Sequence, residues 1–259
     1  MSEWDRPITV EAMYGPWGID HDDIDAALDR SRAPRSSTML YDAFADLDIG
    51  PSHVVLDVGA RNAVHSLRIA ERFGCRVVAV DPIEINVRDA RAAIAEHGSG
   101  SLLDVRQGSI EAIPAADGEF DAVLSRDMLN HVVDIDGALD ECGRVLAPGG
   151  AMVVYQTFAT PLLEPAEAAH IYAGLAIVPE RMSAPAFEEA ARRAGLTVEV
   201  ADPIGSEWRE AWEEDGSGLT SRQLLHAARL LPKREELLHE LGEVPYRVQQ
   251  ANTLWACTR

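Results

Sequence analysis

The chain has 259 residues, which is enough for one large α/β domain or two small ones. Its 23 Lys and Arg against 43 Asp and Glu give a formal net charge of −20, and such a field repels nucleic-acid phosphates and anionic lipids. Lys233 is the only lysine, so a phosphate-binding Gly-Lys-Ser/Thr loop is absent from the sequence. We therefore expect neither a nucleic-acid partner nor a membrane partner.

The compartment and the absence of metal are inferred from three further features. No apolar run reaches membrane length, and the opening MSEWDRPITV lacks the apolar segment of a signal peptide. The cysteines Cys75, Cys142 and Cys257 form no CxxC pair, so we expect reduced, buried thiols. No pair of histidines has the HxxxH spacing of a helical metal site. These features predict a cytoplasmic protein without a bound metal.

Short apolar, β-branched runs alternate with helical stretches from residue 53 to residue 158. Strands are predicted at 53–58, 75–81, 102–108, 120–125 and 151–158, and helices at 63–74, 85–98 and 135–146. Each strand is almost continuously apolar, and single helices separate the strands. This pattern is typical of an α/β fold with a parallel sheet that is covered by helices on both faces.

The remaining segments extend this sheet and flank it. LTVEVAD at 196–202 and YRVQQANTLWAC at 246–257 predict two more strands, which makes a mostly parallel sheet of seven. Two helix-like segments, 22–32 and 36–48, precede the first strand, and a charged helical block precedes the last. The predicted organisation is an N-terminal helical cover (1–50), a cofactor-binding core (51–204), a helical lid insertion (205–245) and a final core strand (246–259).

Polar residues follow the first two strands of the sheet. The first strand ends in Asp57-Val58-Gly59-Ala60-Arg61-Asn62-Ala63, a small turn that lets backbone N–H groups approach a ligand at the next helix. Asp81 ends the second strand, 22 positions after Gly59, where a carboxylate commonly accepts from the hydroxyls of an adenosine ribose. A single strand-end aspartate more often caps a helix, but both features in register favour a nucleoside ligand.

Four blocks carry a resemblance to a known family: VLDVGARNA, VVAVDP, GSIEAIPAADGEFDAVLSRDMLNHV and GRVLAPGGAMVVY, in that order. They resemble the class I S-adenosylmethionine-dependent methyltransferases, within the small-molecule branch that includes ubiquinone/menaquinone-type and phosphoethanolamine methyltransferases. The resemblance covers about residues 50–160 and implies a Rossmann-like core that binds S-adenosyl-L-methionine. It implies nothing specific about the methyl acceptor.

The resemblance implies a cofactor role for residues at four strand ends. The first motif would wrap the methionine part, the second strand end would bind ribose and adenine, the third would flank the adenine, and the fourth would meet the amino group. In that order the matching residues are Asp57, Gly59, Ala60 and Arg61; Asp81 and Pro82; Ser109 and Ile110; and Ser125 and Arg126.

The chain departs from the family pattern at three of these positions. Arg61 and Ala63 stand where the second and third glycines of D-x-G-x-G-x-G belong, and Ser109 stands where many relatives carry Asp. A Cβ in the turn narrows the approach of the backbone to the cofactor. Arg61 adds a cation near the sulfonium or reaches the cofactor carboxylate.

Candidate residues for the reaction follow the fourth strand. The string RDMLNH resembles the phosphoethanolamine methyltransferases, in which the matching Asp127 and His131 lie at the acceptor. His131 is read either as a base or acceptor-orienting group or as a structural hydrogen-bonder. Tyr14 and Trp17 in the N-terminal cover, and His170 after the fifth strand, are further candidates for the acceptor pocket.

The function that fits best is in-line methyl transfer to a small-molecule acceptor, with N- or O-methylation favoured and C-methylation also allowed, by a monomer or homodimer. The alternative is a non-methylating member of the same fold, either pericyclase-like or a cofactor-binding regulatory protein. A nicotinamide-dependent reductase is excluded by its residues, because Arg229 stands where a Tyr-x-x-x-Lys pair with Lys233 would need tyrosine.

Overall fold

The computed structural model describes residues 26–27, 30, 35–36, 38–159, 163, 165–202, 208–209, 231–232 and 235. The chain divides into two units. The core unit comprises Met39–Phe158 and Gly174–Ala201, and the second unit comprises Met1–Thr38, Ala159–Ala173 and Asp202–Arg259.

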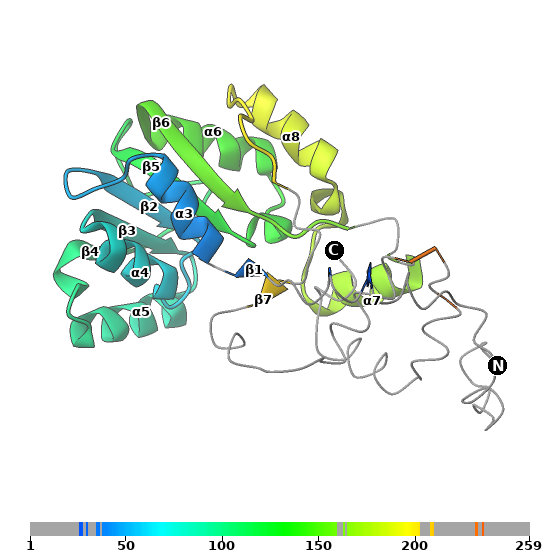
Figure 1. Cartoon of the computed structure of the whole chain (residues 1–259), viewed down its shortest axis with the longest axis horizontal. Helices are drawn as coiled ribbons and strands as arrows, with labels where there is room; N and C mark the ends of the chain where they lie inside the picture. The colour runs from blue at the N-terminus through cyan, green and yellow to red at the C-terminus, as the bar shows by residue number, and fades with distance from the viewer. Residues whose placement is uncertain are drawn as a thin grey trace. The chain divides into compact units, whose positions relative to one another are not determined.

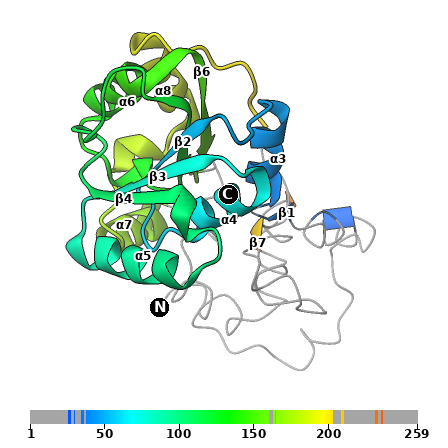
Figure 2. The same ribbon diagram turned by 90° about the vertical axis from the view of Figure 1, so that its left-hand side faces the viewer.

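The core unit is built on a parallel sheet of five strands in the order β4-β3-β2-β5-β6. The strands are β2 (Val54–Val58), β3 (Arg76–Asp81), β4 (Leu103–Gln107), β5 (Phe120–Arg126) and β6 (Leu146–Tyr155). Figure 2 shows β4, β3 and β2 as neighbours in the sheet. The order reverses beside β2, because the chain moves to β3 and β4 on one side and then to β5 and β6 on the other. This reversal marks the position where open α/β sheets bind their ligands.

Helices cover both faces of the sheet (Figure 1). One face carries α3 (Thr38–Asp46), α4 (Val64–Phe73) and α5 (Glu84–Glu96), and the other carries α6 (Ile135–Val145) and α8 (Ala184–Arg193). Alternate strand residues serve the two layers: Val55 and Leu124 pack under α3 and α4, whereas Leu56 and Val123 pack under α6 and α8. Burial of both faces explains the continuous apolar runs of these strands.

The core unit also contains short 3-10 helices, and the second unit contains two short strands and a helix among its described residues. Three 3-10 helices occur in the core unit, η2 (Gly100–Leu102), η3 (Leu129–His131) and η4 (Pro179–Met182). In the second unit, β1 (Arg35–Ser36) pairs in parallel with β7 (Trp208–Arg209), and α7 spans Pro165–Gly174. None of the helices in the described ranges is long and apolar enough to cross a bilayer.

The predicted α/β fold and its parallel sheet are confirmed, but the predicted start of the fifth strand is wrong. The prediction ended a helix at the Pro148-Gly149-Gly150 turn and began the strand at residue 151. In the structure Leu146 already pairs with Phe120, and pairing resumes at Ala151 opposite Ala122. The intervening residues form an irregularity within β6, so the proline and glycines mark a bulge rather than a strand boundary.

The sheet has five strands among the described residues, not the predicted seven. Residues 196–202 have no regular secondary structure, and Val198 and Val200 are exposed. The alternation of LTVEVAD favours a strand, but a strand also needs a hydrogen-bonding partner, and none of the described strands supplies one. The predicted strand at 246–257 lies outside the described residues, as do most of the predicted segments 22–32 and 205–245.

Candidate functional site

The carboxyl ends of β2, β3 and β5 lie side by side at one edge of the core sheet, because these strands are parallel neighbours. Residues Asp57, Asp81 and Arg126 are found at those ends. The edge therefore brings together three of the predicted strand-end residues from positions spread over 70 residues of sequence.

Asp57 is buried, with 3% of its surface exposed. Its Oδ2 accepts a hydrogen bond of 2.5 Å from Ser66 Oγ on α4. Burial raises the pKa of this carboxyl to about 6, although the Ser66 hydroxyl and the Arg126 charge both lower it. Asp57 is thus a poorly solvated carboxyl group at the sheet edge. Burial favours its protonated form, and Ser66 and Arg126 favour its ionised form.

Gly59 begins the turn after β2 and leaves no space for a side chain. Its φ is 75°, and its N–H donates to the carbonyl of Val80 at 2.8 Å. A Cβ at this position would lie 2.8 Å from Met128 Cγ, which is closer than carbon atoms pack. The turn therefore needs glycine for both its conformation and its close approach to the loop after β5.

Arg61 and Ala63, which stand at two glycine positions of the D-x-G-x-G-x-G pattern, adopt the left-handed conformation. Their φ values are 53° and 60°, and Ala63 is fully buried beside Ala79 and Ala90 at the start of α4. A left-handed residue with a side chain costs about 1–2 kcal/mol relative to its ordinary conformation. The departure from the glycine pattern is therefore accommodated as backbone strain, with the shape of the turn retained.

Asp81 holds the same turn from the next strand. Its Oδ2 accepts from the Arg61 N–H at 2.8 Å, and its Oδ1 accepts from the Ile83 N–H at 2.9 Å and from Asn86 Nδ2 at 3.0 Å. A carboxylate has about four acceptor positions, so three protein donors leave room for a hydroxyl of a ligand. Asp81 consequently also holds the turn after β2 through Arg61, a role beyond the ribose contact and the helix cap expected from the sequence.

The residues expected to flank an adenine differ in exposure. Pro82 is exposed and Ser109 is half-buried, whereas the side chain of Ile110 is 3% exposed and belongs to the apolar core beneath α6. Ile83 and Ile85, which follow Pro82, are more than half exposed. Exposed isoleucines directly after a strand end offer an apolar surface to a planar base, and this signal in DPIEI was missed.

Ser125 and Arg126 end β5 and point to opposite faces of the sheet. Ser125 is fully buried, and its Oγ has no hydrogen-bond partner in the structure. The Arg126 guanidinium carbon lies 5.9 Å from the centre of the Tyr155 ring, within range of a cation–π contact. An unpaired buried hydroxyl is uncommon and is compatible with a polar group of a ligand at this strand end.

Asp127 is fixed by its own hydrogen bonds to β6 and the residues after it. Its φ is 49°, its N–H donates to the Tyr155 carbonyl at 2.7 Å, and its Oδ1 accepts from the Thr157 N–H at 2.9 Å. Aspartate tolerates the left-handed conformation better than most residues. One carboxylate oxygen is therefore used to hold the loop, and Oδ2 is the oxygen that could meet an acceptor.

His131 lies in η3 with an exposed side chain. Its Nδ1 is 3.2 Å from the Ala176 carbonyl oxygen. Because a carbonyl can only accept, Nδ1 carries the proton and Nε2 carries the lone pair in the neutral ring. The two roles considered for His131, structural hydrogen-bonder and base, therefore fall on different nitrogens. Nδ1 is a structural donor, and Nε2 has the chemistry of a base.

Tyr41 on α3 and His65 on α4 form a polar pair that was not predicted from the sequence. The Tyr41 hydroxyl is 2.8 Å from His65 Nδ1. Burial, with smaller contributions from the charges of Arg126 and Arg68, lowers the pKa of His65 to about 3, so this ring is neutral at physiological pH. The available signal was position: His65 is in the first turn of the helix that follows the glycine turn, so it must lie near the strand ends.

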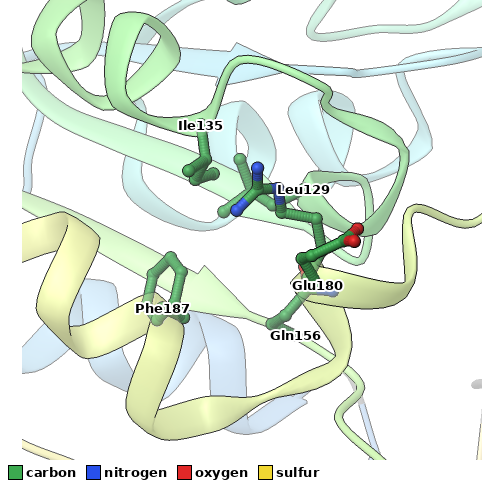
Figure 3. Close-up of a pocket in the computed structure, with 6 residues that line it drawn as sticks. Leu129, Ile135, Gln156, Glu180 and Phe187 are labelled. Carbon is green, nitrogen blue, oxygen red and sulfur yellow. The ribbon is translucent and has the colours of Figure 1, made fainter.

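A small cavity lies beside the loop after β5, on the face of the sheet that α6 and α8 cover (Figure 3). It has a volume of about 10 Å³, roughly the space of one water molecule. Its lining comes from η3, α6, η4, α8 and the residue that follows β6, and consists of Leu129, Ile135, Gln156, Glu180, Arg181 and Phe187. In this form the cavity is too small for a substrate.

Three predicted acceptor residues lie outside the core unit. Tyr14 and Trp17 lie outside the described residues. His170 belongs to α7 in the second unit. Within the described ranges, no group of three histidine, cysteine or acidic side chains is arranged to hold a metal ion. Cys75 and Cys142 are buried free thiols.

Comparisons with known proteins match the core sheet to methyltransferases. Residues 56–154, from β2 to the end of β6, match the family model of a methyltransferase domain. A ubiquinone biosynthesis O-methyltransferase from Methylocella silvestris is 38% identical over 98 residues, which cover 38% of this chain and 37% of that protein. A sarcosine/dimethylglycine N-methyltransferase from Halorhodospira halochloris is 32% identical over 138 residues, which cover 52% of this chain and 47% of that protein.

The matches extend over less than half the length of these curated relatives. Among solved structures, geranyl diphosphate C-methyltransferase from Streptomyces coelicolor has a TM-score of 0.60 at 16% identity, with 90% of this chain and 83% of that one covered. That similarity establishes a shared fold. Residues 56–154 therefore resemble a methyltransferase domain, on the fold that this solved structure shares.

Proposed function

We propose that the whole chain is an S-adenosylmethionine-dependent methyltransferase that transfers a methyl group in line to a small-molecule acceptor. The observation that carries this proposal is the arrangement of Asp57, Gly59 and Asp81 at the edge of the sheet, inside a methyltransferase domain. The names of the relatives favour this activity over the alternative of a non-methylating protein on the same fold.

The residues at the edge fit the cofactor. Gly59 lies where a Cβ would clash with Met128, so the turn is built for a close approach of backbone. Asp81 retains acceptor capacity for ribose hydroxyls, and the exposed Ile83 offers an apolar surface to adenine. The buried Ser125 hydroxyl offers a hydrogen bond to the methionine part. We therefore assign these four residues, together with Asp57, to cofactor binding.

S-adenosylmethionine, when bound, supplies an electrophilic methyl group on a sulfonium. The chain must hold the acceptor nucleophile about 3 Å from that methyl, collinear with the leaving sulfur, and exclude water. A base is required only where the acceptor loses a proton, as a protonated amine, a hydroxyl or a carbon acid does. His131 Nε2 is the candidate for this proton, and Asp127 Oδ2 is the candidate for orienting the acceptor.

The acceptor class is narrowed by the chain and its relatives. The relatives are named for transfer to oxygen and nitrogen, and the solved structure for transfer to carbon. The charge of −20 favours a neutral or cationic acceptor over a polyanion such as a nucleic acid. We propose N- or O-methylation of a small metabolite in the cytoplasm, by a monomer or homodimer.

The segments that flank the methyltransferase domain are proposed to cover the acceptor. Within residues 1–50, α3 packs on the core sheet, so the part before α3 is the proposed cover, together with residues 205–245. Tyr14, Trp17 and His170 are the candidate contacts from outside the core. Slower amide exchange in these segments on cofactor binding would support the proposal, and equal exchange would contradict it.

The activity is tested with S-adenosylmethionine that carries an isotope-labelled methyl group and with a panel of small amines, phenols and amino acids. The proposal predicts cofactor-dependent label in one class of acceptor. His131→Ala should lower turnover by about 10²–10⁴ when a proton must be removed, with cofactor affinity unchanged. Full turnover of His131→Ala with a lowered melting temperature would leave this residue a structural role only.

A further inference from the structure

The loop after β5 is held by a segment far away in the sequence. The Val178 N–H donates to the Asn130 carbonyl at 2.9 Å, and His131 Nδ1 donates to the Ala176 carbonyl. Arg181 adds two more hydrogen bonds to the residues that follow His131. Four hydrogen bonds thus connect residues 176–181 to residues 130–133 within the core unit.

Arg181 makes the strongest of these connections. Its Nε donates to the Val132 carbonyl at 3.0 Å and its Nη2 donates to the Val133 carbonyl at 2.9 Å. The planar guanidinium fits two carbonyls of consecutive residues, a geometry that the single ammonium of lysine does not reproduce. The backbone N–H of Arg181 donates to the Val178 carbonyl at 2.9 Å, so a turn orders the segment that carries Arg181.

Backbone strain occurs on both sides of this connection. Asp127, at the start of the loop, has a φ of 49°, and Ala176, whose carbonyl accepts from His131, has a φ of 52°. A left-handed alanine costs free energy that the surrounding contacts must offset. The strain therefore lies at the two points that determine where His131 is placed and which carbonyl it meets.

We propose that Arg181 is a positioning residue for methyl transfer, which fixes the loop after β5 so that His131 donates through Nδ1 to Ala176 and presents Nε2 as its basic nitrogen. This inference rests on the proposed function, because it assigns His131 to the acceptor. Arg181 acts through two backbone carbonyls and not through contact with the acceptor.

The inference is tested on the full chain with Arg181→Met and Arg181→Lys. The control is Arg192→Met, which removes an exposed arginine of α8 that pairs only with Glu189 among the described contacts of its side chain. Nitrogen-15 NMR of labelled histidine reports which ring nitrogen carries the proton, and His131→Gln assigns the signal. Wild type and Arg192→Met should show the Nδ1–H form, whereas both Arg181 variants should show a mixture of forms.

Kinetics provide the second measurement. We expect kcat to fall by about tenfold to a hundredfold in both Arg181 variants, with cofactor affinity within about twofold of wild type. Full activity of Arg181→Lys would overturn the inference, since charge alone would then suffice. An unchanged His131 tautomer in the variants would also overturn it, whatever their activity. If Arg181→Met does not fold, Arg181→Lys carries the test.

The inference and the proposed function fail in different ways. A wild-type protein that binds the cofactor but methylates no acceptor would remove the proposed function, and with it the role of Arg181 in catalysis. If wild type is active and the Arg181 variants keep full kcat although their His131 tautomer changes, the function stands and only the positioning role is removed.

Discussion

The turn after β2 and the loop after β5 both hold side-chain-bearing residues in the left-handed conformation, but they are stabilised in different ways. Arg61 is held by the Asp81 carboxylate of the neighbouring strand, and Ala63 donates to the carbonyl of Ala60, whose own N–H donates to Val80 of that strand. Asp127 is kept in place by Thr157, 30 residues later, and the rest of its loop by residues 45 to 49 positions away. The turn is a local structure, whereas the loop depends on distant segments of the chain.

The largest effect is expected at Gly59, where the two regions touch. Gly59→Ala adds a Cβ at 2.8 Å from Met128 Cγ in a backbone conformation that alanine disfavours. We expect a loss of about 2–4 kcal/mol in the free energy of unfolding, from left-handed strain and overpacking together. Urea unfolding measures this loss, and cofactor affinity should fall with it.

The matched control for this change is Gly98→Ala. No atom lies within 4 Å of a Cβ at Gly98, and its φ is outside the left-handed region. Its free energy of unfolding should stay within about 0.5 kcal/mol of wild type. Equal effects of the two substitutions would show that the contact between the turn and Met128 is unimportant.

The second prediction concerns pH and the buried carboxyl of Asp57. Its pKa is about 6 in the folded protein and 3.8 in the reference state, so the folded protein binds the extra proton between these values. The contribution of Asp57 to stability therefore falls as the pH rises from about 4 to about 6, by up to about 3 kcal/mol. Asp57→Asn removes this titration, and the difference in unfolding free energy between the two proteins isolates it.

The sign of that difference is decisive. The stability of wild type relative to Asp57→Asn should be greatest below about pH 4 and lowest above pH 7. A rise in relative stability with pH would mean that Ser66 and Arg126 outweigh burial and that the carboxylate is stabilised as an anion. A flat difference would mean that the group is better solvated than its 3% exposure indicates.

The smallest stability effect is expected from restoring a glycine of the turn. Arg61→Gly removes the strain of a left-handed arginine without losing buried contacts, since its side chain is exposed. We expect a gain of about 1 kcal/mol. Asn62→Gly, next to it and outside the left-handed region, should instead lose about 0.5–1 kcal/mol. Destabilisation by both changes would refute the strain argument.

The contrast between the turn and the loop also explains what could be predicted from the sequence. The strands, helices and Asp57, Gly59 and Asp81 could be placed because each depends on a local pattern and on one rule for parallel sheets. The pairing of His131 with Ala176, and of Arg181 with Val132 and Val133, depends on where a later segment of the chain returns to the sheet. No local pattern in the sequence reports such contacts.

Other predictions from the sequence failed or were incomplete for similar reasons. The alternation at 196–202 does not show whether a partner strand is present, and the Pro-Gly-Gly sequence does not distinguish a helix end from a bulge in β6. Asp81 was predicted as a ribose ligand, with a helix cap as the alternative, whereas its carboxylate also accepts from the N–H group of Arg61 in the turn after β2 as well as from Ile83. Its replacement should therefore lower stability as well as affinity.

Calorimetric titration with S-adenosylmethionine and its demethylated product tests the central claim most directly. Wild type should bind both, Asp81→Asn should bind about tenfold more weakly or worse through loss of charge-assisted hydrogen bonds, and Asn86→Ala should stay within about twofold of wild type. Asn86→Ala is the control because it removes one partner of Asp81 and leaves the carboxylate in place. Absence of binding by wild type, or equal affinity of Asp81→Asn, would contradict the assignment of this sheet edge as the cofactor site.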